Sequence, residues 1–117
     1  MKDNTASMVL KEHIQYSHDQ AFREVLMDAA GARVVLICLD DGQNVTPHFH
    51  NNTDDIFVAL EGEGVIETAK TQLSLVPGTC QMVLAGTQHT VRPVSGSRVA
   101  FLVIQNKPYD SIATETV

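Results

Sequence analysis

Short apolar runs, separated by turn-forming residues, recur along this sequence. The two longest runs cover residues 32–39 and 98–105, and both are rich in Val and Ile. Runs of this length and composition are typical of buried strands. No segment keeps the apolar spacing of an amphipathic helix over a length that would form one. The pattern therefore predicts an all-β chain.

Shorter runs predict the remaining strands, at residues 56–60, 65–68, 72–76, 80–84 and 89–93. The segment around His48 is expected to be a strand at an edge or a bulge, because Pro47 lacks an N–H. Residues 21–28 are compatible with a helical turn or an edge strand, and their periodicity does not decide between the two. A short strand is also expected around residues 7–10.

The number and spacing of these strands constrain the architecture. Many short strands at intervals of about 8–12 residues are typical of a sandwich or barrel. An open sheet of such strands would expose its edges, so closure into a jelly-roll β-barrel is favoured. At 117 residues the chain fits a single domain. We expect an N-terminal arm at residues 1–20, the barrel at 21–107 and a polar C-terminal tail at 108–117.

The charge balance is acidic, with 8 Lys and Arg against 14 Asp and Glu. There is no basic cluster, and aromatic residues make up only 5%, so no nucleic-acid partner is expected. No apolar run approaches the roughly 20 residues of a membrane span, and the N-terminus lacks the apolar segment of a signal peptide. We expect a soluble, cytoplasmic protein that has no membrane partner and binds a small molecule.

Two cysteines, Cys38 and Cys80, each lie within an apolar run. A chain of this length can build its own core, so both are interpreted as buried and reduced. Phe57 and Met82 fall on predicted strands and are expected to form core or pocket wall.

Candidate chemistry is concentrated between Gly42 and Gly64, where the chain reads GQNVTPHFHNNTDDIFVALEGEG. If His48, Phe49 and His50 lie on a strand, both imidazoles share a face and their Cα atoms are about 6.5–7 Å apart. Such a pair suits two ligands of one ion, at metal–nitrogen distances of roughly 2.0–2.1 Å. The alternative is a pair of exposed strand histidines without a ligand.

Two spaced motifs extend this pattern. In the first, Gly42 is followed after five residues by His48-Phe49-His50, after four more by Asp55 and after six more by Gly62. In the second, Gly78 is followed after five residues by Leu84-Ala85-Gly86, after two more by His89 and after three more by Pro93. Both motifs resemble those of the cupins, a family of small metal-binding β-barrels of jelly-roll type. The resemblance covers roughly residues 32–105.

The resemblance implies a metal ion held by His48, His50, Asp55 and His89. It also implies a homodimer, to which the N-terminal segment could contribute a strand added to the neighbour's sheet. Taken alone, His89 would be interpreted as a core histidine bound to a backbone carbonyl. Its spacing from Gly86 favours the ligand role.

Three positions depart from the cupin motifs: Asp55 replaces a glutamate, Leu84 a proline and Pro93 an asparagine. Aspartate is shorter by one methylene, about 1.5 Å of reach. Asp55 therefore either binds the ion or accepts a hydrogen bond from a ligating histidine. Asp54 is the competing carboxylate, and strand alternation allows only one of the two to face inward. The spacing to Gly62 favours Asp55.

Imidazoles with one carboxylate suit a divalent transition metal, namely Fe, Mn, Ni, Co, Cu or Zn, whereas Ca and Mg prefer oxygen-rich sites. We expect a metal-dependent enzyme of dioxygenase, lyase or isomerase class that acts on a small metal-chelating molecule. The alternatives are a non-catalytic barrel that binds or senses a sugar-like molecule, and a storage barrel with a vestigial site. No catalytic acid or base stands out, since Tyr16 and Tyr109 lie in the arms.

The remaining cationic and titratable residues are expected to be peripheral. His13 and His18 lie in the polar arm and are interpreted as surface residues. Arg33, Arg92 and Arg98 fall on predicted strands. They are expected to point outward or to form ion pairs, because a buried unpaired charge is unfavourable.

Overall fold

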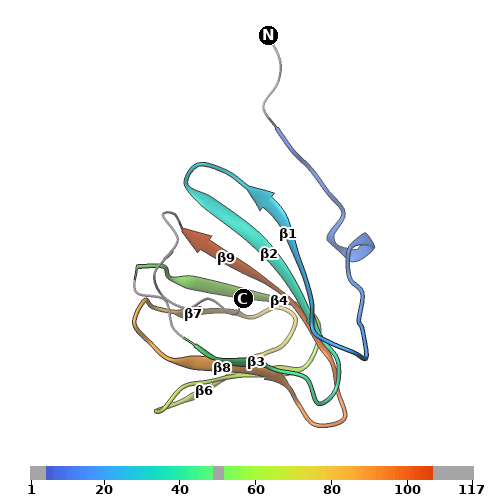
Figure 1. Ribbon diagram of the computed structural model, residues 1–117, viewed down its shortest axis with the longest axis vertical. Helices are drawn as coiled ribbons and strands as arrows, with labels where there is room; N and C mark the ends of the chain where they lie inside the picture. The colour runs from blue at the N-terminus through green and yellow to red at the C-terminus, as the bar shows by residue number, and fades with distance from the viewer. Residues whose placement is uncertain (1–4, 49–51, 107–117) are drawn as a thin grey trace.

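The computed structural model describes residues 5–48 and 52–106, which form two facing β-sheets (Figure 1). The larger sheet has the order β1-β2-β9-β4-β7, with bounds Phe22–Asp28, Ala32–Leu39, Val99–Asn106, Asp55–Gly62 and Cys80–Val83. The smaller sheet has the order β3-β8-β5-β6, with bounds Val45–His48, His89–Pro93, Gly64–Glu67 and Gln72–Leu75. Within the described ranges, hydrogen-bonded neighbours are antiparallel.

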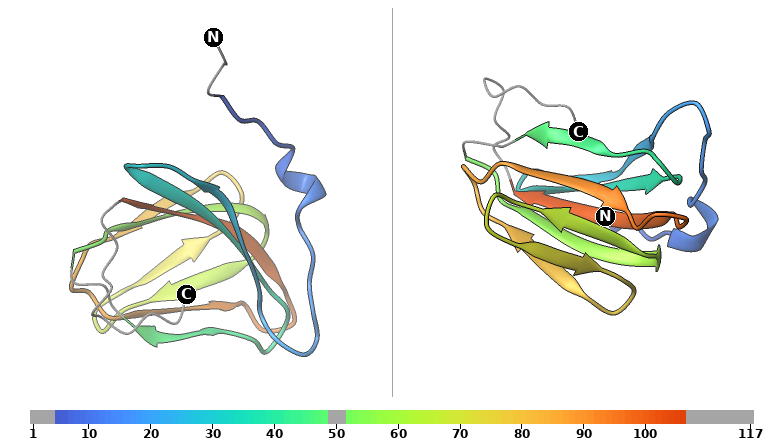
Figure 2. Two further views of the ribbon diagram at one scale, coloured as in Figure 1. Left: turned by 45° about the horizontal axis from the view of Figure 1, so that its top comes forward. Right: turned by 90° about the horizontal axis from the view of Figure 1, so that it is seen from below.

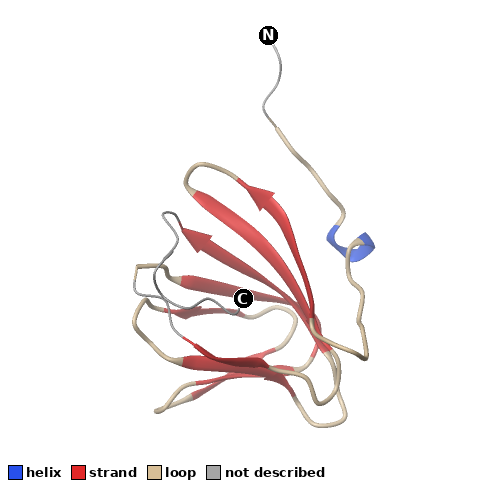
Figure 3. Cartoon of the chain, viewed as in Figure 1, coloured by secondary structure: helices blue, strands red, loops and turns tan. Residues whose placement is uncertain are grey.

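This arrangement confirms the all-β jelly-roll prediction. In the described part of the chain, the two sheets are not hydrogen-bonded to each other into a closed barrel. Figure 2 shows the same two layers from two further directions, and Figure 3 shows that strands make up the body of the molecule. Residues 32–39 form β2 as expected, and residues 22–28 form β1, an edge strand. No helix among residues 5–48 and 52–106 is long and apolar enough to cross a membrane.

Alternation along the strands fills the space between the sheets. In β4, Asp55, Phe57 and Ala59 are buried, whereas the residues between them are only half-buried. The inward side chains of both sheets form one core, whose fully buried members include Leu39, Ile66, Leu75 and Phe101. Full burial of such a side chain contributes about 1.5–3 kcal/mol, so this interior stabilises the fold and fixes which polar groups can face inward.

The N-terminal arm covers part of the outer face of the larger sheet. Its side chains pack against a second buried cluster, which comprises Leu36, Cys38, Ala100 and Leu102. The Tyr16 hydroxyl donates to Glu61 Oε2 at 2.7 Å, and Cζ of Arg98 lies 4.1 Å from the centre of the Tyr16 ring. Residues 5–9 run away from both sheets (Figure 1).

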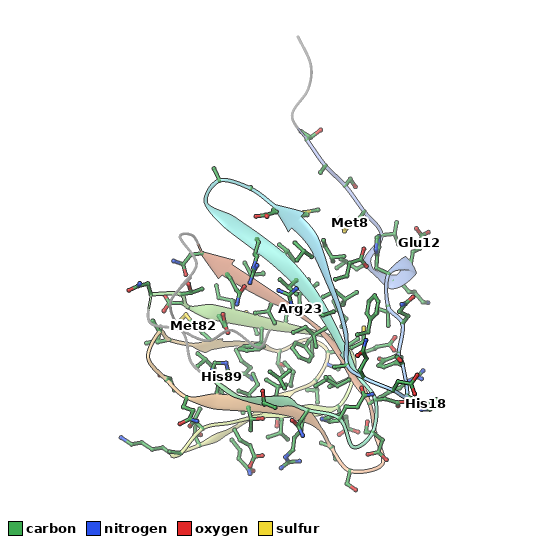
Figure 4. The ribbon with its side chains drawn as sticks, in the orientation of Figure 1. Met8, Glu12, His18, Arg23, Met82 and His89 are labelled. Atoms are coloured by element: carbon green, nitrogen blue, oxygen red, sulfur yellow. The ribbon has the colours of Figure 1, made fainter. Side chains whose placement is uncertain are left out.

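Three expectations about individual positions are wrong. Residues 7–10 form no strand; a 3-10 turn at Leu10–Glu12 stands at this point instead, and Leu10 packs on the sheet. Cys80 is exposed rather than buried, and Met82 is 55% exposed. Both lie on the outward face of β7, an edge strand. Met82 is labelled in Figure 4. Cys38 is buried, and both thiols are free, as predicted.

The motif glycines occupy turns with a left-handed backbone. Gly42, Gly62, Gly78 and Gly86 have φ values of 84°, 81°, 93° and 83°. A Cβ at Gly62 would lie 1.8 Å from the carbonyl oxygen of Arg98, so contact as well as conformation requires glycine there. The first motif therefore ends at a position where the chain cannot carry a side chain.

Candidate functional site

Asp55 and His89 meet in the interior from opposite sheets. Asp55 begins β4 in the larger sheet and His89 begins β8 in the smaller one. Their residues are 2% and 3% exposed, and Nε2 of His89 lies 3.5 Å from Oδ2 of Asp55. That separation is longer than an ordinary hydrogen bond. Figure 4 shows His89 at the opposite end of the sandwich from His18.

A backbone carbonyl orients the His89 ring. Nδ1 lies 2.8 Å from the Thr87 carbonyl oxygen, which can only accept, so Nδ1 carries the proton. In the neutral ring, Nε2 then presents its lone pair towards the Asp55 carboxylate. The Phe57 ring packs edge-on against the imidazole, with centroids 5.9 Å apart and planes at 82°. This contact with a carbonyl is the one expected for a core histidine, and it is also how metal-binding histidines are oriented.

The other oxygen of Asp55 has a different partner. Gln105 on β9 donates from Nε2 to Oδ1 at 2.9 Å. Gln105 is 1% exposed, and the backbone register places it directly opposite Asp55. The two carboxylate oxygens thus face different groups, Oδ1 an amide and Oδ2 an imidazole.

The row of polar groups continues to β2. Arg33 donates from Nε to Oε1 of Gln105 at 2.7 Å, and these two residues are also opposite each other in the register. Arg33 therefore lies on the inner side of the sheet, where its side chain is hydrogen-bonded to Gln105. Burial, and to a lesser degree the positive charge of Arg33, lowers the pKa of the neighbouring Arg23.

Sequence reasoning did not identify Gln105 as a site residue. The available signal was a lone polar residue at the end of the apolar strand 98–105. Its significance depends on strand register, which aligns β2, β9 and β4 and cannot be read from one strand alone.

The structure distinguishes the two neighbouring aspartates. Asp55 faces the interior, whereas Asp54 is half-buried and accepts a hydrogen bond from the Ala85 N–H at 2.8 Å. The Asp54 N–H in turn donates to Oδ1 of Asn106 at 2.9 Å. Asp54 is thus hydrogen-bonded to the segments that contain Ala85 and Asn106. Of the two aspartates, Asp55 is the one beside His89.

The histidine pair is only partly covered by the described residues. Strand β3 ends at His48, whose backbone is paired in register with His89. The side chain of His48, and Phe49 and His50 altogether, lie outside what the structure describes. Within residues 5–48 and 52–106, no group of three or more potential metal-ligating side chains is found.

The donors that are described fit a transition metal. A neutral imidazole nitrogen and a carboxylate oxygen both carry lone pairs, and at 3.5 Å between buried side chains they are stable together when a proton or a cation lies between them. Imidazole and carboxylate are the ligand types that Fe, Mn, Co, Ni, Cu and Zn accept. The pair therefore has the chemistry of half of the predicted ligand set.

The interior behind this pair is almost filled. A cavity of about 10 Å³ remains beside Asp55, lined mainly by Ile37, Phe57 and Phe101. A cavity of this size is at the limit for a single water molecule. This cavity between described residues is therefore too small to hold a substrate.

A larger hollow of about 330 Å³ lies on the other side of β8. It is lined by Glu67, Thr90 and their neighbours, and His89 borders it. Glu67 and Thr90 point outward, because the adjacent Ile66 and Val91 are in the core. Arg92 donates to Glu67 on this outer face at 2.7 Å, an ion pair as expected, and together with Gln72 it lowers the pKa of Glu67. Asp55 is not among the residues that line this hollow.

The family described as "Cupin domain" matches residues 35–105. That match spans more than half of the sequence, so this protein belongs to the cupin family. Its motifs, its jelly-roll sheets and the position of His89 agree with this membership.

Several solved structures are similar to this chain. TT1209 from Thermus thermophilus is 28% identical, with a TM-score of 0.79, covering 86% of this chain and 95% of that one. A protein with a double-stranded β-helix domain from Klebsiella pneumoniae is 16% identical, with a TM-score of 0.81 and coverage of 97% and 100%. KdgF from Halomonas sp. is 19% identical, with a TM-score of 0.74 and coverage of 92% and 99%. No curated protein matched the sequence.

Proposed function

We propose that this protein is a small cupin that binds a divalent transition metal through His48, His50, Asp55 and His89. The observation that carries the proposal is the approach of Nε2 of His89 to Oδ2 of Asp55, at 3.5 Å between two buried side chains. The Thr87 carbonyl supports it, because it occupies Nδ1 and leaves Nε2 as the nitrogen that can face a metal. The backbone pairing of His48 with His89 suits convergence of ligands from both motifs.

The proposed activity is that of a metal-dependent enzyme of dioxygenase, lyase or isomerase class acting on a small chelating molecule. A bound ion of this kind supplies Lewis acidity or redox chemistry at positions left open by the protein. The protein's own residues orient the donors and exclude water. Among the described residues, the buried polar side chains are those of Thr53, Asp55, His89 and Gln105. With no additional buried acid or base in that set, a substrate that chelates the ion directly is favoured.

Tyr16 has no place in this chemistry. Its hydroxyl is bound to Glu61 on the outer face of the larger sheet. Burial, with the hydrogen bond and charge of Glu61, raises the pKa of Tyr16 well above its usual value. A phenol held neutral on that face contributes to attachment of the arm.

Two further parts of the proposal concern assembly and compartment. We propose a homodimer in which the arm of one copy adds to the sheet of its neighbour. Residues 5–9 lead away from both sheets, Val9 among them is 58% exposed, and β1 is an edge strand. A reducing, cytoplasmic location is supported by the free and exposed thiol of Cys80.

Elemental analysis tests the metal proposal. Protein purified without chelators and without a metal-affinity resin should contain about one transition-metal ion per chain, as a single closed site requires. His48→Ala and His89→Ala should lose the ion while the fold is retained, and His18→Ala, which changes a side chain that is 97% exposed, should keep it. Undiminished metal in both site variants would overturn the proposal.

A second measurement distinguishes an enzyme from the alternative, a non-catalytic barrel that binds or senses a sugar-like molecule. Oxygen uptake and product formation are followed with a panel of enediols, diketones and thiols on the metal-loaded protein. Turnover that disappears with His89→Ala supports the enzyme. A molecule that raises the melting temperature without being converted supports the binding protein.

A further inference from the structure

Three residues on neighbouring strands form a continuous polar row that ends at the proposed metal site. Arg33 on β2, Gln105 on β9 and Asp55 on β4 are aligned by the registers of both strand pairs. Their contacts are 2.7 Å from Arg33 Nε to Gln105 Oε1 and 2.9 Å from Gln105 Nε2 to Asp55 Oδ1. The row therefore crosses the larger sheet at one level.

The hydrogen bonds of this row can run in only one donor-to-acceptor order, from Arg33 through Gln105 to Asp55. Arginine carries only donors, so the atom of Gln105 that faces Arg33 must be its carbonyl oxygen. The amide nitrogen of Gln105 must then face Asp55, where an ionised carboxylate can only accept. Arg33 thus removes the ambiguity that normally attaches to the orientation of a glutamine amide.

The burial of the row makes these hydrogen bonds important. Gln105 is 1% exposed and Asp55 is 2% exposed, so water does not substitute for a lost partner. A hydrogen bond to an ionised carboxylate is about twice as strong as one between neutral groups. The hydrogen bond from Gln105 therefore restrains the Asp55 carboxylate through Oδ1.

We propose that Gln105 is a positioning residue of the metal site, which reserves Oδ1 of Asp55 and leaves Oδ2 alone to bind the ion. This inference rests on the proposed metal-binding function. Asp55 then binds through a single oxygen, on the side facing Nε2 of His89. Arg33 acts one step further away, by fixing the direction of the Gln105 amide.

A single-oxygen ligand has a chemical consequence. A carboxylate that is free to turn can bind an ion through both oxygens and so fill an additional coordination position. With Oδ1 held by Gln105, that position stays open for a chelating substrate. The restraint also suits an aspartate, whose shorter side chain gives it less freedom to adjust than the glutamate of the family motif.

Cobalt binding to the full-length protein tests this inference. Gln105→Leu removes the donor with little change in volume, and Gln105→Met serves as a second variant of similar length if the first does not fold. Affinity for Co²⁺ is measured by competition with a chelator, and the visible absorption spectrum reports the coordination number. Gln81→Leu is the matched control, because Gln81 donates to the Ser74 carbonyl at 2.8 Å on an exposed part of β7.

The expected loss of Co²⁺ affinity for Gln105→Leu is about 10–100-fold, the usual effect of removing a partner of a ligand. The absorption bands should shift as Asp55 turns. Arg33→Met should lose less affinity than Gln105→Leu. In the Gln105→Leu background it should cause no further loss, because its effect passes through the amide.

The outcomes separate this inference from the function on which it rests. If the wild-type protein binds Co²⁺ and Gln105→Leu or Gln105→Met binds it with the same affinity and spectrum, the positioning role is wrong and the metal site stands. If the losses of Co²⁺ affinity caused by Arg33→Met and Gln105→Leu are additive, Arg33 does not act through the Gln105 amide. If the wild-type protein binds no metal, the proposed function and this inference are overturned together.

Discussion

His89 and Asp55 belong to different sheets, yet Nε2 of the first lies 3.5 Å from Oδ2 of the second in the interior. The second motif and the first motif thus each deliver one donor to the same point. The Thr87 carbonyl orients the imidazole, and the Gln105 amide orients the carboxylate. His89 is held through Nδ1 and Asp55 through Oδ1, while Nε2 and Oδ2 face each other.

Asp55→Asn should lower metal affinity by more than the roughly 10–100-fold expected for a supporting partner, since it replaces a charged ligand by a neutral amide. The fold should persist, because the amide has the same shape. Competition with a chelator measures the affinity, and circular dichroism checks the fold.

Asp54→Asn is the matched control, because Asp54 binds the Ala85 N–H and stands apart from His89. It should retain wild-type metal affinity. Equal losses for the two variants would show that the affinity depends on the general negative charge of this segment rather than on Asp55.

Gly62→Ala should destabilise the protein more than Gly42→Ala. Both residues have a positive φ, which costs a residue with a Cβ about 1–2 kcal/mol. Only at Gly62 does the added Cβ meet backbone, 1.8 Å from the Arg98 oxygen, whereas Gly42 has open space. The free energy of unfolding in urea measures both, and equal values would contradict the described turn.

The pH dependence of the unfolding free energy should show how much the Tyr16 contact of the N-terminal arm contributes to stability. Because the pKa of Tyr16 is raised in the folded state, its stabilising effect is fully present below the unfolded value near 10 and is lost as the pH rises through the folded value. The unfolding free energy of the wild-type protein should therefore fall as the pH rises above about 10. Tyr16→Phe should be less stable at neutral pH and should show a smaller fall. A parallel dependence in both proteins would contradict attachment of the arm through Tyr16.

The dimer proposal predicts a specific effect of the arm. Val9→Asp places a charge on the exposed arm and should shift the protein towards monomer in sedimentation velocity. Val94→Asp changes an exposed valine in the turn between β8 and β9 and should leave the assembly unchanged. A monomeric wild-type protein, or a dimer insensitive to Val9→Asp, would rule out the arm as the contact.

The strands could be predicted well from the sequence, because Val- and Ile-rich runs and the glycine turns mark them locally. Strand alternation allowed only one of Asp54 and Asp55 to face inward, and the spacing to Gly62 favoured Asp55, which is the buried one. The exposure of Cys80 and Met82 could not be predicted, because whether the outer face of an edge strand is covered depends on distant segments. The same holds for Leu10, whose apolar side chain packs on the sheet rather than belonging to a strand.

The polar row was the largest omission. Arg33 and Gln105 look like ordinary ends of apolar strands, and nothing local relates them to Asp55. Only the registers of β2, β9 and β4 align them. The predicted ligands His48 and His50 stay predictions, since the described residues include the His48 backbone alone.

Anomalous diffraction from crystals grown with the co-purified metal tests the central claim most directly. The account predicts one strong anomalous peak per chain, within bonding distance of Nε2 of His89 and Oδ2 of Asp55 and with Oδ1 still facing Gln105. A peak elsewhere on the molecule, or no peak beside His89 in protein shown to contain metal, would contradict it.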